Sequence, residues 1–193
     1  MSQEYILEMT DIVKEFPGVR ALKGVQLKVR PGTVHTLMGE NGAGKSTLMK
    51  CLIGIHPPTS GKIVFEGKEI QFKNTLEALN SGISMIHQEL NPEPHLTVAE
   101  SIFLKRENTK GIFLDKKAQN KRCQEILDQF DVPYTATTKM KELTLAQVQM
   151  VEIIKAVSCD SRLIIMDEPT SSLDSTETDR LFNVIRDLKL ARC

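Results

Sequence analysis

The sequence predicts an α/β fold, because apolar strands, loops and helices follow one another in the order that this fold class requires. A short, mostly apolar run at 34–38 is followed by a glycine-rich loop and by helix formers up to Ile53. A second apolar run, at 163–166, ends in the acids Asp167 and Glu168. The chain between these two regions is polar and helical, which indicates a helical insertion in an α/β core.

The glycine-rich loop fits the phosphate-binding pattern G-x-x-x-x-G-K-[ST] at every required position. Its glycines let the backbone turn tightly, so that N–H groups can point inward at an anion. Lys45 brings a mobile positive charge to the outer phosphates, and Ser46 offers a hydroxyl to a phosphate-bound magnesium ion. The helix that follows adds the positive end of its dipole. The residues of this predicted site are Gly39, Glu40, Asn41, Gly42, Ala43, Gly44, Lys45, Ser46 and Thr47.

Short strands are predicted around this loop. The run at 25–29 alternates apolar and polar residues, and Gly67 separates two short runs that predict a hairpin. The run at 83–86 is apolar apart from Ser84, which indicates a buried strand. The strand candidates of the first half are residues 5–9, 25–29, 34–38, 62–65, 69–70 and 83–86.

Helices are predicted in the middle and last thirds of the chain. Thr97 and Glu100 form the sequence pattern of a capping box for a short helix, and Asp115 can cap a longer one. Residues 145–157 carry apolar side chains at helical spacing. A last helix is predicted from about Thr176, with an apolar stripe that we interpret as core.

The two acids that follow the apolar run at 163–166 predict a metal site. A buried strand that delivers adjacent carboxylates to its C-terminal edge places them where open α/β sheets bind ligands. In phosphate-loop enzymes an acid at this point holds magnesium, and we assign that role to Asp167. Glu168 would then orient and deprotonate the attacking water. The alternative is an ordinary turn into a helix, which Pro169 would also fit.

Composition argues against several classes of protein. The 25 Lys and Arg residues equal the 25 Asp and Glu residues, so no global charge attracts nucleic acid or an anionic membrane. No apolar run approaches the length of a membrane span, and the N-terminus does not fit a secretory signal. The four cysteines lack metal-ligand spacing, so we interpret them as reduced cytosolic thiols.

These motifs, in this order and spacing, make the chain resemble the nucleotide-binding subunit of ATP-binding cassette (ABC) transporters, from about Tyr5 to about Lys189. Phe16 lies where the family places an aromatic residue that stacks on adenine. Gln88 resembles the glutamine that joins the metal and the attacking water to the membrane partner. Glu168 is followed by Pro and Thr, as the family requires. By themselves, Phe16 could be ordinary core and Gln88 a polar residue at a strand end.

Two further segments carry the resemblance. The first occupies the place of the family's Leu-Ser-Gly-Gly-Gln signature, and in it Thr144 keeps a hydroxyl for the γ-phosphate bound by the opposing subunit. Leu145 and Ala146 replace two glycines, so a Cβ stands where backbone should approach phosphate, and we expect weaker nucleotide-dependent dimerisation. The second, with Ser172 and Asp174, resembles the loop that links the two active sites of the dimer. The signature residues are Leu143, Thr144, Leu145, Ala146 and Gln147.

The resemblance implies a phosphate-loop ABC ATPase with an N-terminal antiparallel β subdomain and a helical insertion subdomain. The expected parts of this single cassette are 1–88, 89–160 and 161–193. It implies ATP and Mg²⁺ as cofactors, with Ser46, Gln88 and Asp167 at the metal and Glu168 and Gln88 in catalysis. It implies a second cassette bound head to tail, membrane-spanning permease subunits, and indirectly a sugar-binding protein, at the cytoplasmic face of the membrane.

The amino-acid sequences of several segments are similar to those of the cassettes of monosaccharide importers. Galactose and methyl galactosides are the favoured substrates, and ribose, xylose or arabinose are possible. Family members carry a histidine on a strand after the last predicted helix, whereas this sequence ends at Cys193 and its four histidines precede Asp167. We therefore expect a C-terminally incomplete cassette that binds ATP and hydrolyses it weakly alone. The alternatives are a truncated remnant with little or no hydrolysis and a soluble ABC ATPase without a transport role.

Overall fold

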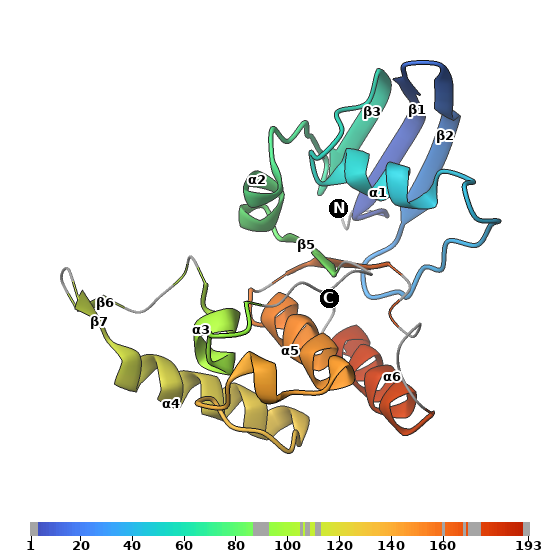
Figure 1. Cartoon of the computed structure of the whole chain (residues 1–193). Coiled ribbons are helices and arrows are strands. Elements are labelled where there is room, and N and C mark those ends of the chain that lie inside the picture. The colour runs from blue at the N-terminus through green and yellow to red at the C-terminus, as the bar shows by residue number, and fades with distance from the viewer. Residues whose placement is uncertain are drawn as a thin grey trace. The chain divides into compact units, whose positions relative to one another are not determined.

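The computed structural model describes residues 4–86, 93–104, 106, 109–110, 113–159, 161–167, 169 and 175–190. The chain divides into two compact units, each with its own helices or sheet (Figure 1). Unit 1 comprises Met1–Met85, Arg162–Ile165 and Asp187–Cys193, and unit 2 comprises Ile86–Ser161 and Met166–Arg186.

Unit 1 contains a four-stranded antiparallel sheet in the order β2-β1-β3-β4 (Figure 1). Leu7 in the first strand pairs with Val29 on one side and with Phe65 on the other, and all three are buried. The strands predicted at 5–9, 25–29, 62–65 and 69–70 are confirmed with shifted bounds, and the first two extend further toward their shared hairpin than the short runs indicated. The bounds are Leu7–Phe16 for β1, Val19–Val29 for β2, Ser60–Phe65 for β3 and Lys68–Glu69 for β4.

The first helix of unit 1 follows the predicted signal, and the second, at 75–80, was not predicted. Helix α1 (Lys45–Leu52) buries Leu48, Met49, Cys51 and Leu52 in the core that includes the sheet residues Leu7, Met9 and Ile12. Burial raises the pKa of the Cys51 thiol, so this cysteine stays protonated at neutral pH. Helix α2 (Thr75–Asn80) is capped by Asn74, whose side chain accepts a hydrogen bond from the backbone N–H of Glu77.

A short second sheet pairs β5 (Ile83–Ile86) with β8 (Leu163–Met166), and both strands have the predicted bounds. The N–H of Leu163 donates to the carbonyl of Gly82 at 3.1 Å, and the N–H of Asp167 donates to the carbonyl of Ile86 at 3.2 Å. Because both numberings rise together, the two strands run parallel, as strands of an α/β core do.

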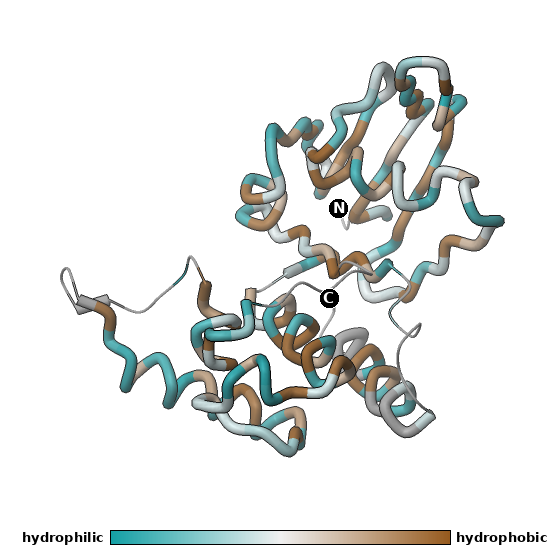
Figure 2. Tube along the Cα trace, viewed as in Figure 1, coloured by the Kyte–Doolittle hydropathy of each residue, from teal (hydrophilic) through white to brown (hydrophobic). Residues whose placement is uncertain are grey.

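The strand predicted at 34–38 is wrong. The chain between β2 and α1 includes apolar stretches (Figure 2), but it forms no strand, and Val34 and Met38 are 60% and 89% exposed. No strand within the described residues pairs with it, and only Leu37 packs partly against the core. An apolar run becomes a buried strand only where a neighbour satisfies its backbone and covers its side chains, and the periodicity of the run cannot report the neighbour.

Unit 2 is mainly helical; two of its helix starts follow predicted caps, and the cap of a third was not predicted. Thr97 and Glu100 form a complete capping box before α3, Asp115 caps α4, and Thr144 caps α5. Helix α3 packs against α4 and α5. The bounds are Val98–Ile102 for α3, Thr109–Lys110 for β6, Phe113–Leu114 for β7, Lys116–Leu127 for α4, Asp128–Phe130 for η1, Met140–Glu142 for η2, Leu145–Val157 for α5 and Ser175–Leu190 for α6.

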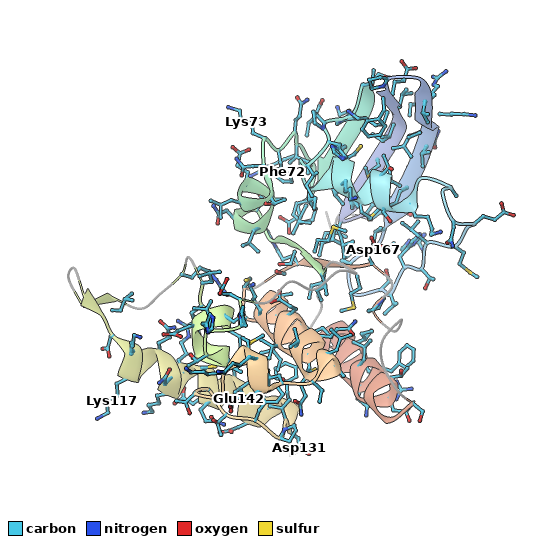
Figure 3. All side chains as sticks on the ribbon, in the orientation of Figure 1. Phe72, Lys73, Lys117, Asp131, Glu142 and Asp167 are labelled. Atoms are coloured by element: carbon cyan, nitrogen blue, oxygen red, sulfur yellow. The ribbon has the colours of Figure 1, made fainter. Side chains whose placement is uncertain are left out.

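The core of unit 2 is apolar and its surface is charged. Val98, Ile102 and Ile154 are fully buried at its centre. Lys117, Asp131 and Glu142 are exposed on the outside of this unit (Figure 3). Among the described helices of the whole chain, none is long and apolar enough to cross a membrane.

Candidate phosphate-binding site

The glycine-rich loop forms one wall of an open pocket of about 550 Å³ in unit 1. The opposite wall is the first half of β2, which no sequence motif marks as part of the site. The lining residues are Val19, Arg20, Ala21, Lys23, Val25, Gly42, Ala43, Gly44, Lys45, Ser46 and Thr47. Six of the nine predicted loop residues therefore share one pocket, with room for a polyphosphate.

Gly44 fixes the start of helix α1. It occupies the N-cap position with φ 93°, in the left-handed region that favours glycine. A Cβ built on it would lie 2.8 Å from Cδ2 of Leu22 and 2.9 Å from the carbonyl oxygen of Ala21, so the loop touches β2 directly. Because glycine has no side chain, Gly44 cannot cap the N–H groups of the first helical turn with a side-chain hydrogen bond. The helix therefore presents its N-terminus to the pocket, as anion sites require.

Lys45 is held at the loop that it follows. Its Nζ donates to the carbonyl oxygens of Gly39 at 2.6 Å and Glu40 at 3.0 Å. An ammonium has three donors, so this arrangement leaves the charge in contact with the loop and one donor for an incoming oxygen. The backbone N–H of Ala43 also donates to the carbonyl of Glu40, at 3.1 Å, which closes the turn.

The charge of the pocket is positive although the chain is neutral overall. The described lining residues include Arg20, Lys23 and Lys45 and no Asp or Glu. Arg20 also contacts Glu15, with Nε 3.4 Å from the carboxylate, but both side chains are 53% exposed and this surface pair is weak. Three cations around one pocket favour a ligand with several negative charges. Sequence reasoning missed Arg20 and Lys23, because only the pairing of β2 with β1 turns this stretch toward the loop.

Phe16, the predicted base-stacking residue, lies at the end of β1 in the same unit and is half-buried. It is not among the residues that line the 550 Å³ pocket. Its ring packs perpendicular to the ring of His56, with centroids 5.3 Å apart, and Nζ of Lys14 lies 5.0 Å from its centroid.

The signature segment lies in unit 2, at the start of α5. Thr144 Oγ1 accepts a hydrogen bond from the N–H of Gln147 at 3.3 Å, and Oε1 of Gln147 accepts one from the N–H of Thr144 at 3.0 Å. Leu145 is 55% exposed, whereas Ala146 lines a small cavity of about 40 Å³. Leu143 packs partly against the core of this unit. The segment thus forms a capped helix start with an exposed apolar residue at its first position.

Asp167 directly follows β8 in unit 2, and its backbone is fixed by the hydrogen bond to Ile86 (Figure 3). The helix carrying the signature reaches the same segment, because Nε2 of Gln149 donates to the carbonyl of Pro169. Gln149 is buried, and no sequence pattern indicates this contact. The predicted residues Gln88, Glu168, Ser172 and Asp174 lie outside the described residues.

Gly44 and Gly42 offer a matched pair of substitutions. Both have positive φ, 93° and 82°, but a Cβ on Gly42 meets nothing within 4 Å among the described residues. We expect Gly42→Ala to cost about 1 kcal/mol from backbone strain alone. Gly44→Ala adds the overlap with β2, for a further loss of about 1–3 kcal/mol in the free energy of unfolding. Urea unfolding of both variants measures the difference, and equal losses would contradict the packing described for Gly44.

Comparison with known proteins places these features in one family. Residues 22–171 match the model of the family described as ABC transporter. A protein of Geobacillus kaustophilus (strain HTA426), provisionally named a ribose/galactose/methyl galactoside import ATP-binding protein, is 54% identical over 191 residues, which cover 98% of this chain and 38% of that protein. The galactose/methyl galactoside import ATP-binding protein MglA of Fusobacterium nucleatum is 53% identical over 186 residues, covering 96% and 37%.

A solved structure has the same fold. It is the ADP conformation of an ATP-binding cassette of an ABC transporter, similar with a TM-score of 0.84 at 29% identity over 98% of this chain and 79% of that one. The chain spans 38% and 37% of the two relatives named above. The predicted fold class is thereby confirmed, and the chain belongs to the ABC transporter family and has the fold of its ATP-binding cassettes.

Proposed function

We propose that the pocket of unit 1 binds the phosphates of ATP and that the intact protein uses ATP hydrolysis to drive import of a monosaccharide. The observation that carries the proposal is the geometry of the loop. Gly44 leaves the N-terminus of α1 open toward a pocket that Lys45, Arg20 and Lys23 make positive. This arrangement combines the helix dipole, backbone donors and mobile cations that polyphosphate recognition requires.

Magnesium fits the donor chemistry of the proposed residues. Ser46 lines the pocket in the first turn of α1 and offers a hydroxyl oxygen, and Asp167 offers a carboxylate at the end of β8. Mg²⁺ prefers such hard oxygen ligands and takes few of them from protein when it binds with nucleotide phosphates. When bound, the ion would neutralise charge that develops on the phosphates. We assign Ser46, Asp167 and Gln88 to it, and we assign the orientation of the attacking water to Glu168 and Gln88.

We further propose that a second cassette completes the site. The family resemblance assigns Leu143–Gln147 to the nucleotide held by the opposing cassette, and Ser172 and Asp174 to communication between the two sites. The N-terminus of the 13-residue helix α5 supports this assignment because it is the positive end of the helix dipole, although the Thr144 side chain already accepts from the N–H of Gln147. Ala146 in place of glycine weakens the close approach to phosphate. The remaining proposed partners are membrane-spanning permease subunits, which the protein would contact at the cytoplasmic face of the membrane, and a separate sugar-binding protein.

Lys45→Ala tests the phosphate assignment. Loss of the ammonium removes the only lysine within the loop, and we expect ATP affinity to fall about tenfold to a hundredfold, measured by calorimetry in the presence of Mg²⁺. The matched control is Lys50→Ala, since Lys50 lies in the last turn of the same helix and does not line the pocket. We expect the control to bind ATP as the parent chain does. Equal affinity in the parent chain and Lys45→Ala would refute the proposed phosphate site.

Monosaccharide import is proposed from the names of the relatives, with galactose and methyl galactosides favoured because the Fusobacterium nucleatum protein carries that name. A chimera tests it: residues aligned to this chain in that protein are replaced by residues of this chain, and uptake of labelled galactose and ribose is measured in cells that depend on the chimera. We expect galactose uptake to be retained. Loss of uptake by a chimera that still binds ATP would contradict the assignment to a sugar importer.

A further inference from the structure

The short loop between α1 and β3 holds the base-stacking candidate of unit 1 in place. At one end, the backbone N–H groups of Ile55 and His56 donate to the carbonyl of Lys50 at 3.0 and 3.2 Å, which ties the loop to the last turn of α1. At the other end, the N–H of Thr59 donates to the carbonyl of Val13 at 2.8 Å. The loop therefore connects the helix of the phosphate pocket to the end of β1.

Three consecutive residues of β1 contact this loop, each in a different way. Nζ of Lys14 donates to the carbonyl of Pro57 at 2.9 Å. The N–H of Glu15 donates to Oγ1 of Thr59 at 3.0 Å. The ring of Phe16 packs against the ring of His56 at 85° and 5.3 Å. The ammonium of Lys14 lies over the ring of Phe16, 5.0 Å from its centroid, so a stacked base would use the opposite face.

We infer that His56 is a positioning residue that orients Phe16 for the base of the nucleotide. This inference rests on the proposed function, in which Phe16 stacks on that base. A half-buried aromatic side chain loses less conformational entropy when it stacks on a flat ligand if a neighbouring ring already fixes its orientation. Perpendicular ring pairs at this distance are favourable beyond the area that they bury. The backbone N–H of His56 donates to the carbonyl of Lys50, so the ring of His56 is attached to the end of the helix that begins at the glycine-rich loop.

The role predicts that His56 affects nucleotides and not bare phosphate chains. We propose to measure the dissociation constants of ATP and of inorganic tripolyphosphate, both with Mg²⁺, for the 193-residue chain and four variants: His56→Ala, His56→Phe, Phe16→Ala and the double variant Phe16→Ala with His56→Ala. His56→Phe keeps a ring for the edge contact and serves as the conservative rescue. Urea unfolding of each variant checks that unit 1 remains folded under the conditions of the titration.

We expect His56→Ala to weaken ATP binding about threefold to tenfold and to leave tripolyphosphate binding unchanged. His56→Phe should restore most of the ATP affinity. Phe16→Ala should weaken ATP binding roughly tenfold or more, because stacking of a base on an aromatic ring is lost. In the Phe16→Ala background, His56→Ala should have no further effect, since the two residues then act through one ring.

Three results separate the possible failures. If Phe16→Ala leaves ATP affinity unchanged, the proposed stacking is refuted, and the inference about His56 falls with it. If Phe16→Ala weakens ATP binding but His56→Ala does not, the positioning role alone is overturned. If His56→Ala weakens ATP and tripolyphosphate equally, His56 supports unit 1 in general, and the positioning role is again overturned.

Discussion

The contact between Gly44 and β2 is the constraint on which the pocket of unit 1 depends. The left-handed backbone of Gly44 brings the loop against the carbonyl of Ala21 and the side chain of Leu22, closer than any other residue type would allow. This contact sets where α1 begins and which way its first N–H groups point. It also makes β2 the second wall of the pocket, so the antiparallel sheet lines the pocket as well as contributing to the core.

The electrostatics of the pocket follow from that placement. A neutral chain offers no long-range attraction to a polyanion, yet local charge can still be strongly positive. Lys45 comes from the loop itself, and Arg20 and Lys23 come from β2 once the loop packs against it. The same sheet reaches Phe16 at the end of β1, where the loop containing His56 returns from α1. One helix is thus linked at its start to the phosphate pocket and at its end to the candidate base-stacking ring.

Local signals predicted much of the fold because they depend on residues close in sequence. The predicted caps Thr97 and Asp115 each begin a helix, the helix at 145–157 has the expected bounds, and so do the strands at 83–86 and 163–166. These features need only a local hydrogen bond or a short apolar run. The turn and helix start at 39–47 were also predictable, because the glycine and lysine spacing reflects a backbone turn and not a distant partner.

The remaining features depend on residues far apart in sequence. The run at 34–38 has the composition of a strand, but it is exposed, since no described strand lies beside it. Arg20 and Lys23 belong to the pocket only because β2 passes the loop. The contact of His56 with Phe16 joins positions 40 residues apart in sequence, and the contact of Gln149 with Pro169 joins positions 20 residues apart. No periodicity or motif in one segment can report such pairs.

The central claim is that the N-terminus of α1 and its loop bind nucleotide phosphates. The most direct measurement follows the backbone amide resonances of the chain by NMR as Mg²⁺ and ATP are added. We expect the largest shifts at the amides of residues 42–47, because these N–H groups would bind the negatively charged phosphates, and smaller shifts at the facing residues of β2. Saturating ATP that leaves the amides of 42–47 unchanged, or that shifts a different part of the chain, would contradict this claim.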